Sequence, residues 1–231
     1  MVQEKGLVII PAYNEEKHIS EVVSRAVSYL ETYVIDDGSK DQTAIQAEKS
    51  GAKVFQQIPN QGKGKALIRG FKEALDADAG YVITLDADGQ HDVQEIPAFI
   101  ELYHSKPHDL IIGSRDFSKM PFIRRFSNTV GTISFSWAMG RKISDNQSGY
   151  RLISRRLMQK MLTSPESGFE FEVEMIAIAV ESNYSIGWVP IKTIYADEKS
   201  HIQPLKHVIN FFRIVFKTRE RMRNSVKKEI L

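Results

Sequence analysis

Short apolar runs alternate along the chain with stretches in which apolar residues recur at helical spacing. Residues 7–11 and 81–85 are almost entirely apolar and are followed by polar residues, which is the pattern of buried strands. Between 19 and 30 the apolar residues recur every three or four positions, as on the buried face of a helix. The same patterns place further strands at 33–37, 53–55, 110–112 and 190–195, and a further helix at 66–75. Strands that alternate with helices predict an α/β fold with a mainly parallel sheet.

Paired carboxylates follow one of these strands directly. The apolar run 81–85 ends in Asp86 and Asp88, and Gln90 comes two residues later. The carboxyl ends of parallel strands lie at one edge of an open sheet, where ligands bind. Oxygen ligands suit Mg²⁺ or Mn²⁺, and such ions usually keep positions for substrate phosphates. A cation site is therefore predicted here, with a polar turn that caps a helix as the alternative.

Six motifs extend this picture and carry a resemblance. IPAYNEE, VIDDGSKDQT, NQGKGKAL, LDADGQH, GSR at 113–115 and DNQSGYR at 145–151 occur in the order seen in family 2 glycosyltransferases. Over about residues 7–204 the chain most resembles the polyprenyl-phosphate (dolichyl-phosphate mannose) synthase branch. The resemblance implies a GT-A fold, with a Rossmann-like mixed, mainly parallel sheet and helices on both faces. It also implies a nucleotide diphosphate sugar donor, a divalent cation (Mg²⁺ or Mn²⁺) and inversion at the anomeric carbon.

The resemblance assigns residues to donor and metal. A cation among these side chains would neutralise the diphosphate as it leaves. His91 is a further candidate ligand, although a capping or packing role is the alternative. Either member of the acidic pair after the second strand can accept from a base N–H while the other supports the loop, or both can form a cap and turn. The implied donor-binding residues are Pro11, Tyr13, Glu15, Asp36, Asp37, Lys63, Asp86, Ala87 and Asp88, and the implied metal ligands are Asp86, Asp88 and Gln90.

The second half of the motif region is expected to bind the acceptor. Residues 1–115 form the donor half and residues 116–204 the acceptor half of a single domain. An arginine offers two parallel N–H donors that suit a phosphate, although a surface salt bridge is the alternative role for Arg124 and its neighbour Arg125. One glutamate of the GFEFEVE motif at 168–174 is expected to face the site. The implied acceptor-binding residues are Arg115, Arg124, Ser127, Asn128 and Lys199.

Asp145 has two alternative roles that depend on the acceptor. A hydroxyl acceptor must lose its proton as it attacks, so Asp145 would then be the general base. A phosphate acceptor is already ionised near neutral pH, so Asp145 would then orient Arg151, Arg124 or the acceptor loop. In either case the residues expected to take part in catalysis are Asp86, Asp88, Arg115 and Asp145.

The charge distribution is uneven along the 231 residues. The net charge of the chain is +2, but residues 201–231 contain eight Lys or Arg against two Glu, so the remainder is acidic. Apolar residues between 205 and 216 recur at helical spacing, which predicts a basic amphipathic helix over 205–231. This helix either packs on the domain or lies on an anionic membrane surface. Nucleic-acid binding is not expected, because the rest of the chain is acidic and lacks a recognisable nucleic-acid module.

Other features of the composition bear on location. The chain contains no cysteine, so disulfides and thiolate chemistry are excluded. No basic and apolar leader precedes the first strand, and no apolar run approaches the roughly 18 to 20 residues that span a bilayer. We therefore expect a cytoplasmic protein that is soluble or peripheral on the inner face of the membrane.

Together these features predict an inverting, metal-dependent hexosyltransferase. It would move mannose or glucose from GDP-mannose or UDP-glucose to polyprenyl phosphate at the cytoplasmic membrane face. One alternative is the same donor chemistry with a soluble or glycan hydroxyl acceptor. Another is a catalytically silent nucleotide-sugar binding protein, which the intact carboxylates and arginines of the motifs disfavour. A sugar nucleotidyltransferase is disfavoured because its Gly-rich, Arg-containing N-terminal loop is missing.

Overall fold

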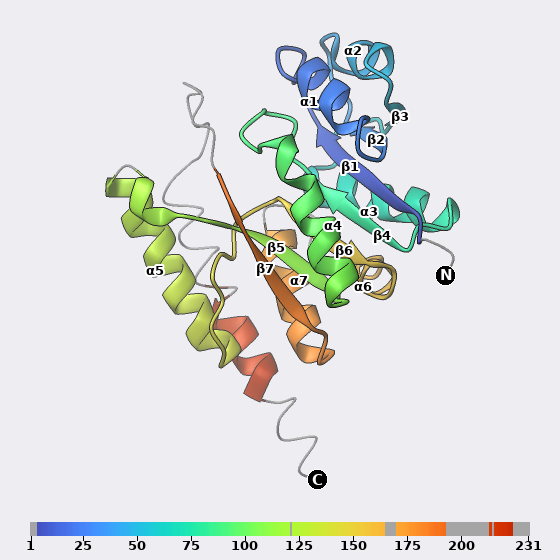
Figure 1. Cartoon of the computed structure of the whole chain (residues 1–231). Coiled ribbons are helices and arrows are strands. Elements are labelled where there is room, and N and C mark those ends of the chain that lie inside the picture. The colour runs from blue at the N-terminus through green and yellow to red at the C-terminus, as the bar shows by residue number, and fades with distance from the viewer. Residues whose placement is uncertain (1–3, 121, 165–169, 193–212, 214, 224–231) are drawn as a thin grey trace.

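The computed structural model describes residues 4–120, 122–164, 170–192, 213 and 215–223 (Figure 1). Within these residues, strands form one sheet in the order β3-β2-β1-β4-β6-β5-β7, and β6 runs antiparallel to both of its neighbours. The other pairs are parallel. The strands are β1 (Gly6–Ala12), β2 (Glu31–Asp36), β3 (Lys53–Gln56), β4 (Tyr81–Thr84), β5 (Leu110–Arg115), β6 (Arg151–Ser154) and β7 (Ile186–Ile191). The predicted mixed, mainly parallel sheet is confirmed.

Helices cover both faces of this sheet. They are α1 (Ile19–Ala26), α2 (Thr43–Lys49), α3 (Lys63–Asp76), α4 (Ile96–Ser105), α5 (Phe122–Met139), α6 (Arg155–Met161) and α7 (Glu170–Glu181), with short 3-10 turns η1 (Val93–Glu95) and η2 (Phe117–Lys119). None of the described helices is both long enough and apolar enough to cross a bilayer.

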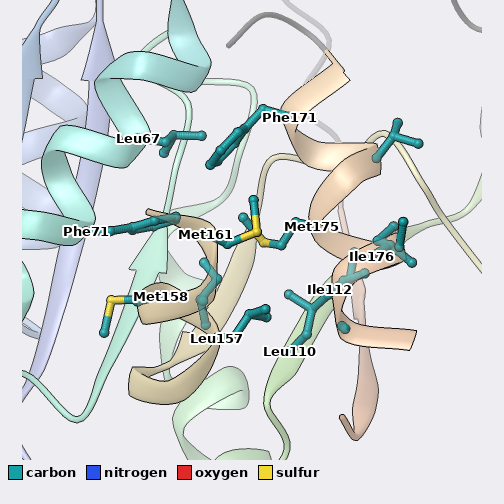
Figure 2. Close-up of a cluster of buried hydrophobic side chains, with 14 of the residues drawn as sticks. Leu67, Phe71, Leu110, Ile112, Leu157, Met158, Met161, Phe171, Met175 and Ile176 are labelled. Carbon is teal, nitrogen blue, oxygen red and sulfur yellow. The ribbon is translucent and has the colours of Figure 1, made fainter. Parts of the chain in front are cut away.

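Two hydrophobic clusters hold the layers together, one on each face of the sheet. Successive side chains of β1 point to opposite faces, so Leu7 belongs to one cluster and Val8 to the other. Figure 2 shows the first cluster, in which side chains of α3, α6 and α7 such as Phe71 and Phe171 meet those of β5. The second cluster joins α1 and α4 to the sheet, and Phe99 of α4 stacks on Tyr150 with ring centroids 4.4 Å apart. A buried aromatic such as Phe71 contributes about 3–5 kcal/mol to stability, judged by its replacement with alanine.

The position of β6 determines which loop reaches the functional edge. Because β6 is antiparallel, its first residue, Arg151, lies beside Thr84 at the end of β4 and beside Ile112 in β5. The loop at 145–150 therefore arrives at the edge where the parallel strands end. The hydrophobic pattern did not predict β6, because four residues that begin with a buried arginine give no clear strand signal.

A polar cluster around one buried carboxylate joins the segment before β5 to α6 and to the segment before β7. We call it the Asp109 network (Asp109, Arg156 and Ser185). The Asp109 carboxylate accepts hydrogen bonds from the guanidinium of Arg156, from the Ser185 backbone N–H at 2.9 Å and from its hydroxyl at 3.1 Å. Burial raises the pKa of Asp109, but the contact with Arg156 and those with Ser185 outweigh it, so the pKa is lowered overall.

The C-terminal region includes a packed helical segment. Residues 213 and 215–223 are helical, and Val215 and Met222 are buried in the first cluster. Arg221 pairs with Glu174 of α7 at 2.8 Å, and Figure 1 shows this segment in red beside the end of α5. These contacts are those of a helix packed on the domain. The rest of the predicted helix over 205–231 lies outside the described residues, as do residues 193–195 of the last predicted strand.

Candidate active site

A cavity of about 480 Å³ opens at the carboxyl ends of β1, β2 and β4. Eight of the nine residues predicted to bind the donor line it, and Asp36 is the exception. The sheet therefore brings together residues that are far apart in the sequence. The lining residues are Pro11, Ala12, Tyr13, Glu15, Asp37, Asn60, Gly62, Lys63, Ala66, Asp86, Ala87 and Asp88.

The acidic pair after β2 holds two loops in place. The carboxylate of Asp36 accepts from the Ser39 backbone N–H at 3.1 Å, and the residue does not line the cavity. The carboxylate of Asp37 accepts from the backbone N–H groups of Gln61 at 2.8 Å and Gly62 at 2.7 Å. Both aspartates are buried. These hydrogen bonds are those expected if the two aspartates form a cap and a turn, and they hold the loop from which α3 begins. Contact of either aspartate with the nucleobase stays a prediction.

The loop after β1 is tied to the loop after β2. Asn14 has a φ of 55° and donates its backbone N–H to the Ser39 hydroxyl at 2.9 Å. The Glu15 backbone N–H donates to the hydroxyl of Thr43 at 2.8 Å. These contacts hold Tyr13, an exposed aromatic residue, at the rim of the cavity. The sequence analysis did not identify Asn14 and Ser39 as the residues that join the two loops.

Asp86 lies in the most strongly charged part of the cavity. Its Oδ1 is 2.5 Å from Nζ of Lys63, which also lies 2.7 Å from Oε1 of Glu172 on α7. Burial raises the pKa of Asp86, but Lys63, His91 and Arg115 together outweigh this effect and lower the pKa to about 2. Burial lowers the pKa of Lys63, yet the two carboxylates outweigh it and raise the pKa above its ordinary value. Lys63 and Asp86 are therefore both charged at neutral pH.

The donor atoms at the end of β4 suit a cation that also binds substrate. Asp88 accepts the Gln90 backbone N–H at 2.9 Å, in a turn where Gly89 has a φ of 73°. Gln90 does not line the cavity, so its role as a ligand stays a prediction. No group of three or more His, Cys, Asp or Glu side chains among the described residues could hold a metal. Two carboxylates fit Mg²⁺ or Mn²⁺, which complete their shells with water and phosphate oxygens.

His91 has the contacts of a supporting residue. Its Nδ1 accepts the Asp86 backbone N–H at 3.3 Å, and its ring lies against that of Tyr150 with centroids 5.1 Å apart. Burial lowers the pKa of His91, although Asp86 and Asp88 oppose this effect. These contacts correspond to the capping and packing alternative.

Gly149 is a site residue that the sequence analysis missed. A Cβ atom at this position would lie 2.7 Å from Oδ2 of Asp86, and the Gly149 carbonyl accepts the Thr84 hydroxyl at 2.7 Å. Only a glycine leaves room for the carboxylate without a shift. The one signal in the sequence was a glycine inside the DNQSGYR motif, and its neighbour in space could not be read from that motif.

Two residues predicted to act on the acceptor side, Arg115 and Asp145, form an ion pair around a buried carboxylate. Asp145 is fully buried and accepts from Nε of Arg115 at 2.7 Å and from its Nη2 at 3.0 Å. It also accepts the backbone N–H groups of Gln147 at 3.0 Å and Ser148 at 3.2 Å. The carboxylate is therefore fully engaged in holding an arginine and a loop. Arg151 does not contact Asp145 directly and instead donates to the carbonyls of the same loop and of α7.

A second cavity of about 480 Å³ adjoins this ion pair. Arg115 lines it together with Glu95, Ser114, Asp116, Pro190, Ile191 and Lys192. Oε1 of Glu95 accepts the Lys192 backbone N–H at 2.8 Å, whereas its Oε2 is buried without a hydrogen-bond partner among the described residues. Burial raises the pKa of Glu95. The sequence analysis did not identify Glu95, because it lies outside the motifs.

Two other predicted acceptor residues, Ser127 and Asn128, do not line this cavity. Ser127 is exposed on α5, and Asn128 donates its amide to Sδ of Met120 at 3.1 Å. Arg124 lies in the first turn of the same helix. Lys199 lies outside the described residues, so its role stays a prediction.

Comparison with known proteins agrees with the fold and the motifs. The sequence model of Glycosyl transferase family 2 matches residues 7–162. The chain therefore belongs to glycosyl transferase family 2, as the motifs predicted.

Two relatives support the expected branch. The UDP-N-acetylglucosamine–dolichyl-phosphate N-acetylglucosaminyltransferase of Methanococcus voltae is 33% identical over 217 residues, which cover 82% of this chain and 86% of the relative. The polyprenol monophosphomannose synthase of Mycolicibacterium smegmatis is 30% identical over 205 residues, which cover 81% and 77% of the two chains. The resemblance to polyprenyl-phosphate sugar transferases is confirmed.

A solved structure supports the fold. Glucosyl-3-phosphoglycerate synthase from Mycobacterium tuberculosis, crystallised with Mn²⁺, UDP-glucose and phosphoglyceric acid, superimposes with a TM-score of 0.71 at 20% identity. The similarity covers 93% of this chain and 78% of that one. The predicted GT-A fold in a single domain is confirmed.

Proposed function

We propose that this protein is an inverting, metal-dependent glycosyltransferase that moves a sugar from a nucleotide diphosphate sugar to polyprenyl phosphate. The observation that carries the proposal is the cavity at the strand ends, where Asp86, Asp88 and Lys63 meet the loops after β1 and β2. Mannose and glucose are the predicted sugars, with GDP-mannose or UDP-glucose as donor. The Methanococcus voltae relative adds N-acetylglucosamine to this set.

The donor half can be assigned from the cavity lining. Asp86 and Asp88 would hold Mg²⁺ or Mn²⁺, and that ion, when bound, neutralises charge on the departing diphosphate. Lys63 supplies a cation that belongs to the protein at the same place. Pro11, Tyr13 and Glu15 line the same cavity, and we assign them to contact with the nucleoside.

The state of Asp145 favours a phosphate acceptor. A general base needs a free lone pair directed at the acceptor hydroxyl, but both carboxylate oxygens of Asp145 accept hydrogen bonds from Arg115 and the backbone. A phosphate nucleophile is already ionised and needs no base. We therefore assign Asp145 to the orientation of Arg115, which lines the second cavity.

A hydroxyl acceptor is the second candidate, and one observation favours it. Glu95 lines the second cavity, no described residue forms a hydrogen bond with its Oε2, and its pKa is raised, as a general base requires. Glu95→Gln separates the two acceptors. The variant should keep near-normal transfer to polyprenyl phosphate, whereas a hydroxyl acceptor would lose about 100- to 10,000-fold in rate.

An exposed apolar face on α5 supports action at a membrane. We call it the α5 stripe: Phe122, Phe126, Val130, Ile133 and Trp137, all exposed. Their spacing of four, four, three and four residues places them on one side of the helix. Phe216 of the C-terminal segment is also exposed and lies against Trp137, with ring centroids 6.3 Å apart. A lipid surface at the cytoplasmic face would cover this stripe and present a polyprenyl phosphate to the acceptor half.

One assay tests the proposal. Radiolabelled GDP-mannose, UDP-glucose and UDP-N-acetylglucosamine are offered with polyprenyl phosphate and Mg²⁺ or Mn²⁺, and lipid-linked label is extracted. Label should appear with one donor and disappear with a chelator. Asp88→Asn should abolish transfer while thermal unfolding stays cooperative. Nucleotide binding without transfer to any acceptor would instead identify a catalytically silent binding protein.

A further inference from the structure

One ammonium group lies between two carboxylates at the wall of the donor cavity. Nζ of Lys63 is 2.5 Å from Oδ1 of Asp86 and 2.7 Å from Oε1 of Glu172. The three side chains come from the start of α3, the end of β4 and the start of α7. Lys63 is therefore shared between a predicted metal ligand and a glutamate that has no role in the chemistry described above.

Glu172 is the fixed member of this group. Its side chain is only 5% exposed, and its backbone carbonyl accepts Nη1 of Arg151 at 2.5 Å. The adjacent residues Phe171 and Val173 are buried in the hydrophobic core. The side chain of Lys63, by contrast, is 36% exposed and ends four methylenes from its backbone. If the arrangement changes, the ammonium is the part that can move.

The carboxylate of Asp86, unlike the Lys63 ammonium, has little room to move. Gly149 borders one carboxylate oxygen so closely that a Cβ there would lie 2.7 Å away, and Nε2 of His91 is 3.9 Å from the same oxygen. A divalent cation bound to Asp86 would meet the Lys63 ammonium at close range, and two positive charges at such a distance repel strongly. Binding of the metal therefore requires Lys63 to leave Asp86.

We propose that Lys63 is a tethered counter-ion of the metal site. Its ammonium neutralises Asp86 while no metal-nucleotide is bound, and it moves from Asp86 to the donor diphosphate when the metal-nucleotide enters. Glu172 is the positioning residue that keeps the ammonium at the cavity wall during this exchange. The inference rests on the proposed function, because it takes a nucleotide diphosphate as the ligand. It explains why a bare cation should bind weakly and why cation and nucleotide should bind together.

The decisive measurement is Mn²⁺ binding to the full chain in the absence of nucleotide. Free Mn²⁺ is followed by electron paramagnetic resonance for the wild type, for Lys63→Met and for the control Lys65→Met, an exposed lysine two residues further along α3. Lys63→Met should bind Mn²⁺ about tenfold more tightly than the wild type, because the competing charge is gone. Lys65→Met should match the wild type. With UDP or GDP present, Lys63→Met should bind the nucleotide more weakly.

Equal Mn²⁺ affinities for Lys63→Met and Lys65→Met would overturn the proposal. If Lys63→Met does not fold, Lys63→Gln makes the same comparison and should shift Mn²⁺ affinity in the same direction. Glu172→Gln should weaken nucleotide binding when Lys63 is present but not in the Lys63→Met background. An equal loss of nucleotide affinity in both backgrounds would refute the inference that Glu172 acts by positioning Lys63. A protein that shows the Mn²⁺ effect but transfers no sugar would contradict the proposed function and leave the counter-ion role standing.

Discussion

Replacement of Asp145 by asparagine separates the two roles available to this residue. The side chain keeps its size but loses its charge. Arg115 now donates at 2.7 and 3.0 Å to both carboxylate oxygens, whereas the asparagine amide can accept only one such bond, and its NH2 group would face the other N–H donor. Asp145 is fully buried, and breaking a buried ion pair by removing one partner costs about 3–5 kcal/mol. For a domain of this size that corresponds to a fall of roughly 6 to 20 °C in the unfolding midpoint.

The kinetic consequence depends on which role is correct. If Asp145 orients Arg115, the variant should raise the KM for polyprenyl phosphate on the order of tenfold, because one charge-assisted contact is worth about 1.5–3 kcal/mol. The shape of the pH profile of kcat should not change, since no proton is transferred by this residue. Transfer is measured at saturating donor and metal across the neutral pH range, alongside thermal unfolding. Asp76→Asn is the control, because Asp76 is exposed at the end of α3 and lines neither cavity.

The opposite result would refute this reasoning. A general base contributes about 100- to 10,000-fold in rate, so its loss would appear in kcat. It would also remove the acidic limb of the pH profile. An Asp145→Asn variant with near-normal stability, a collapsed kcat and an altered pH profile would make Asp145 the base and the acceptor a hydroxyl.

Three further predictions follow from other contacts. Gly149→Ala should weaken metal-dependent nucleotide binding by about tenfold or more, because the added Cβ would collide with the Asp86 carboxylate. Isothermal titration calorimetry with Mn²⁺ and nucleotide measures this affinity. Unchanged binding would show that the loop at 145–150 can shift to make room for the Cβ. Asp109→Asn should destabilise the fold by about 2–3 kcal/mol through the Asp109 network. Because folding lowers the pKa of Asp109, the ionised side chain stabilises the fold above its unfolded-state pKa of about 4, and this stabilisation is lost as the pH falls through the lower folded-state pKa. In denaturant titrations at several pH values, the free energy of unfolding of the variant should therefore fall less steeply at acidic pH than that of the wild type. An equal fall in both proteins would contradict this. Phe126→Ser should reduce co-sedimentation with anionic vesicles, whereas Ile45→Ser, an exposed apolar residue on α2, should not; equal binding by both would remove the α5 stripe from the membrane surface.

The donor side could be predicted from the sequence because its geometry follows from local signals. Each of these parallel strands can be recognised as an apolar run, and the polar residues that follow the strands lie at the same edge of the sheet. The strand pattern predicts that Tyr13, Asp37 and Asp86 follow strands at this edge, and the resemblance to family 2 glycosyltransferases assigns them to the donor; all three line the cavity. The roles of Asp36 and Asp37 were harder to predict, because a carboxylate directly after a strand can either support a loop or bind a nucleobase, and the sequence does not distinguish these roles.

The acceptor side depends on one long-range pairing that has no local signal. Strand β6 enters the sheet between β4 and β5 in the antiparallel direction, so its start lies at the edge where its neighbours end. Only this reversal carries the loop at 145–150 to the functional edge. There Gly149 touches Asp86 on one side, and Asp145 holds Arg115 on the other. The same loop therefore contacts Asp86, which lines the first cavity, and Arg115, which lines the second, so a displacement of β6 should disturb ligand binding in both cavities together.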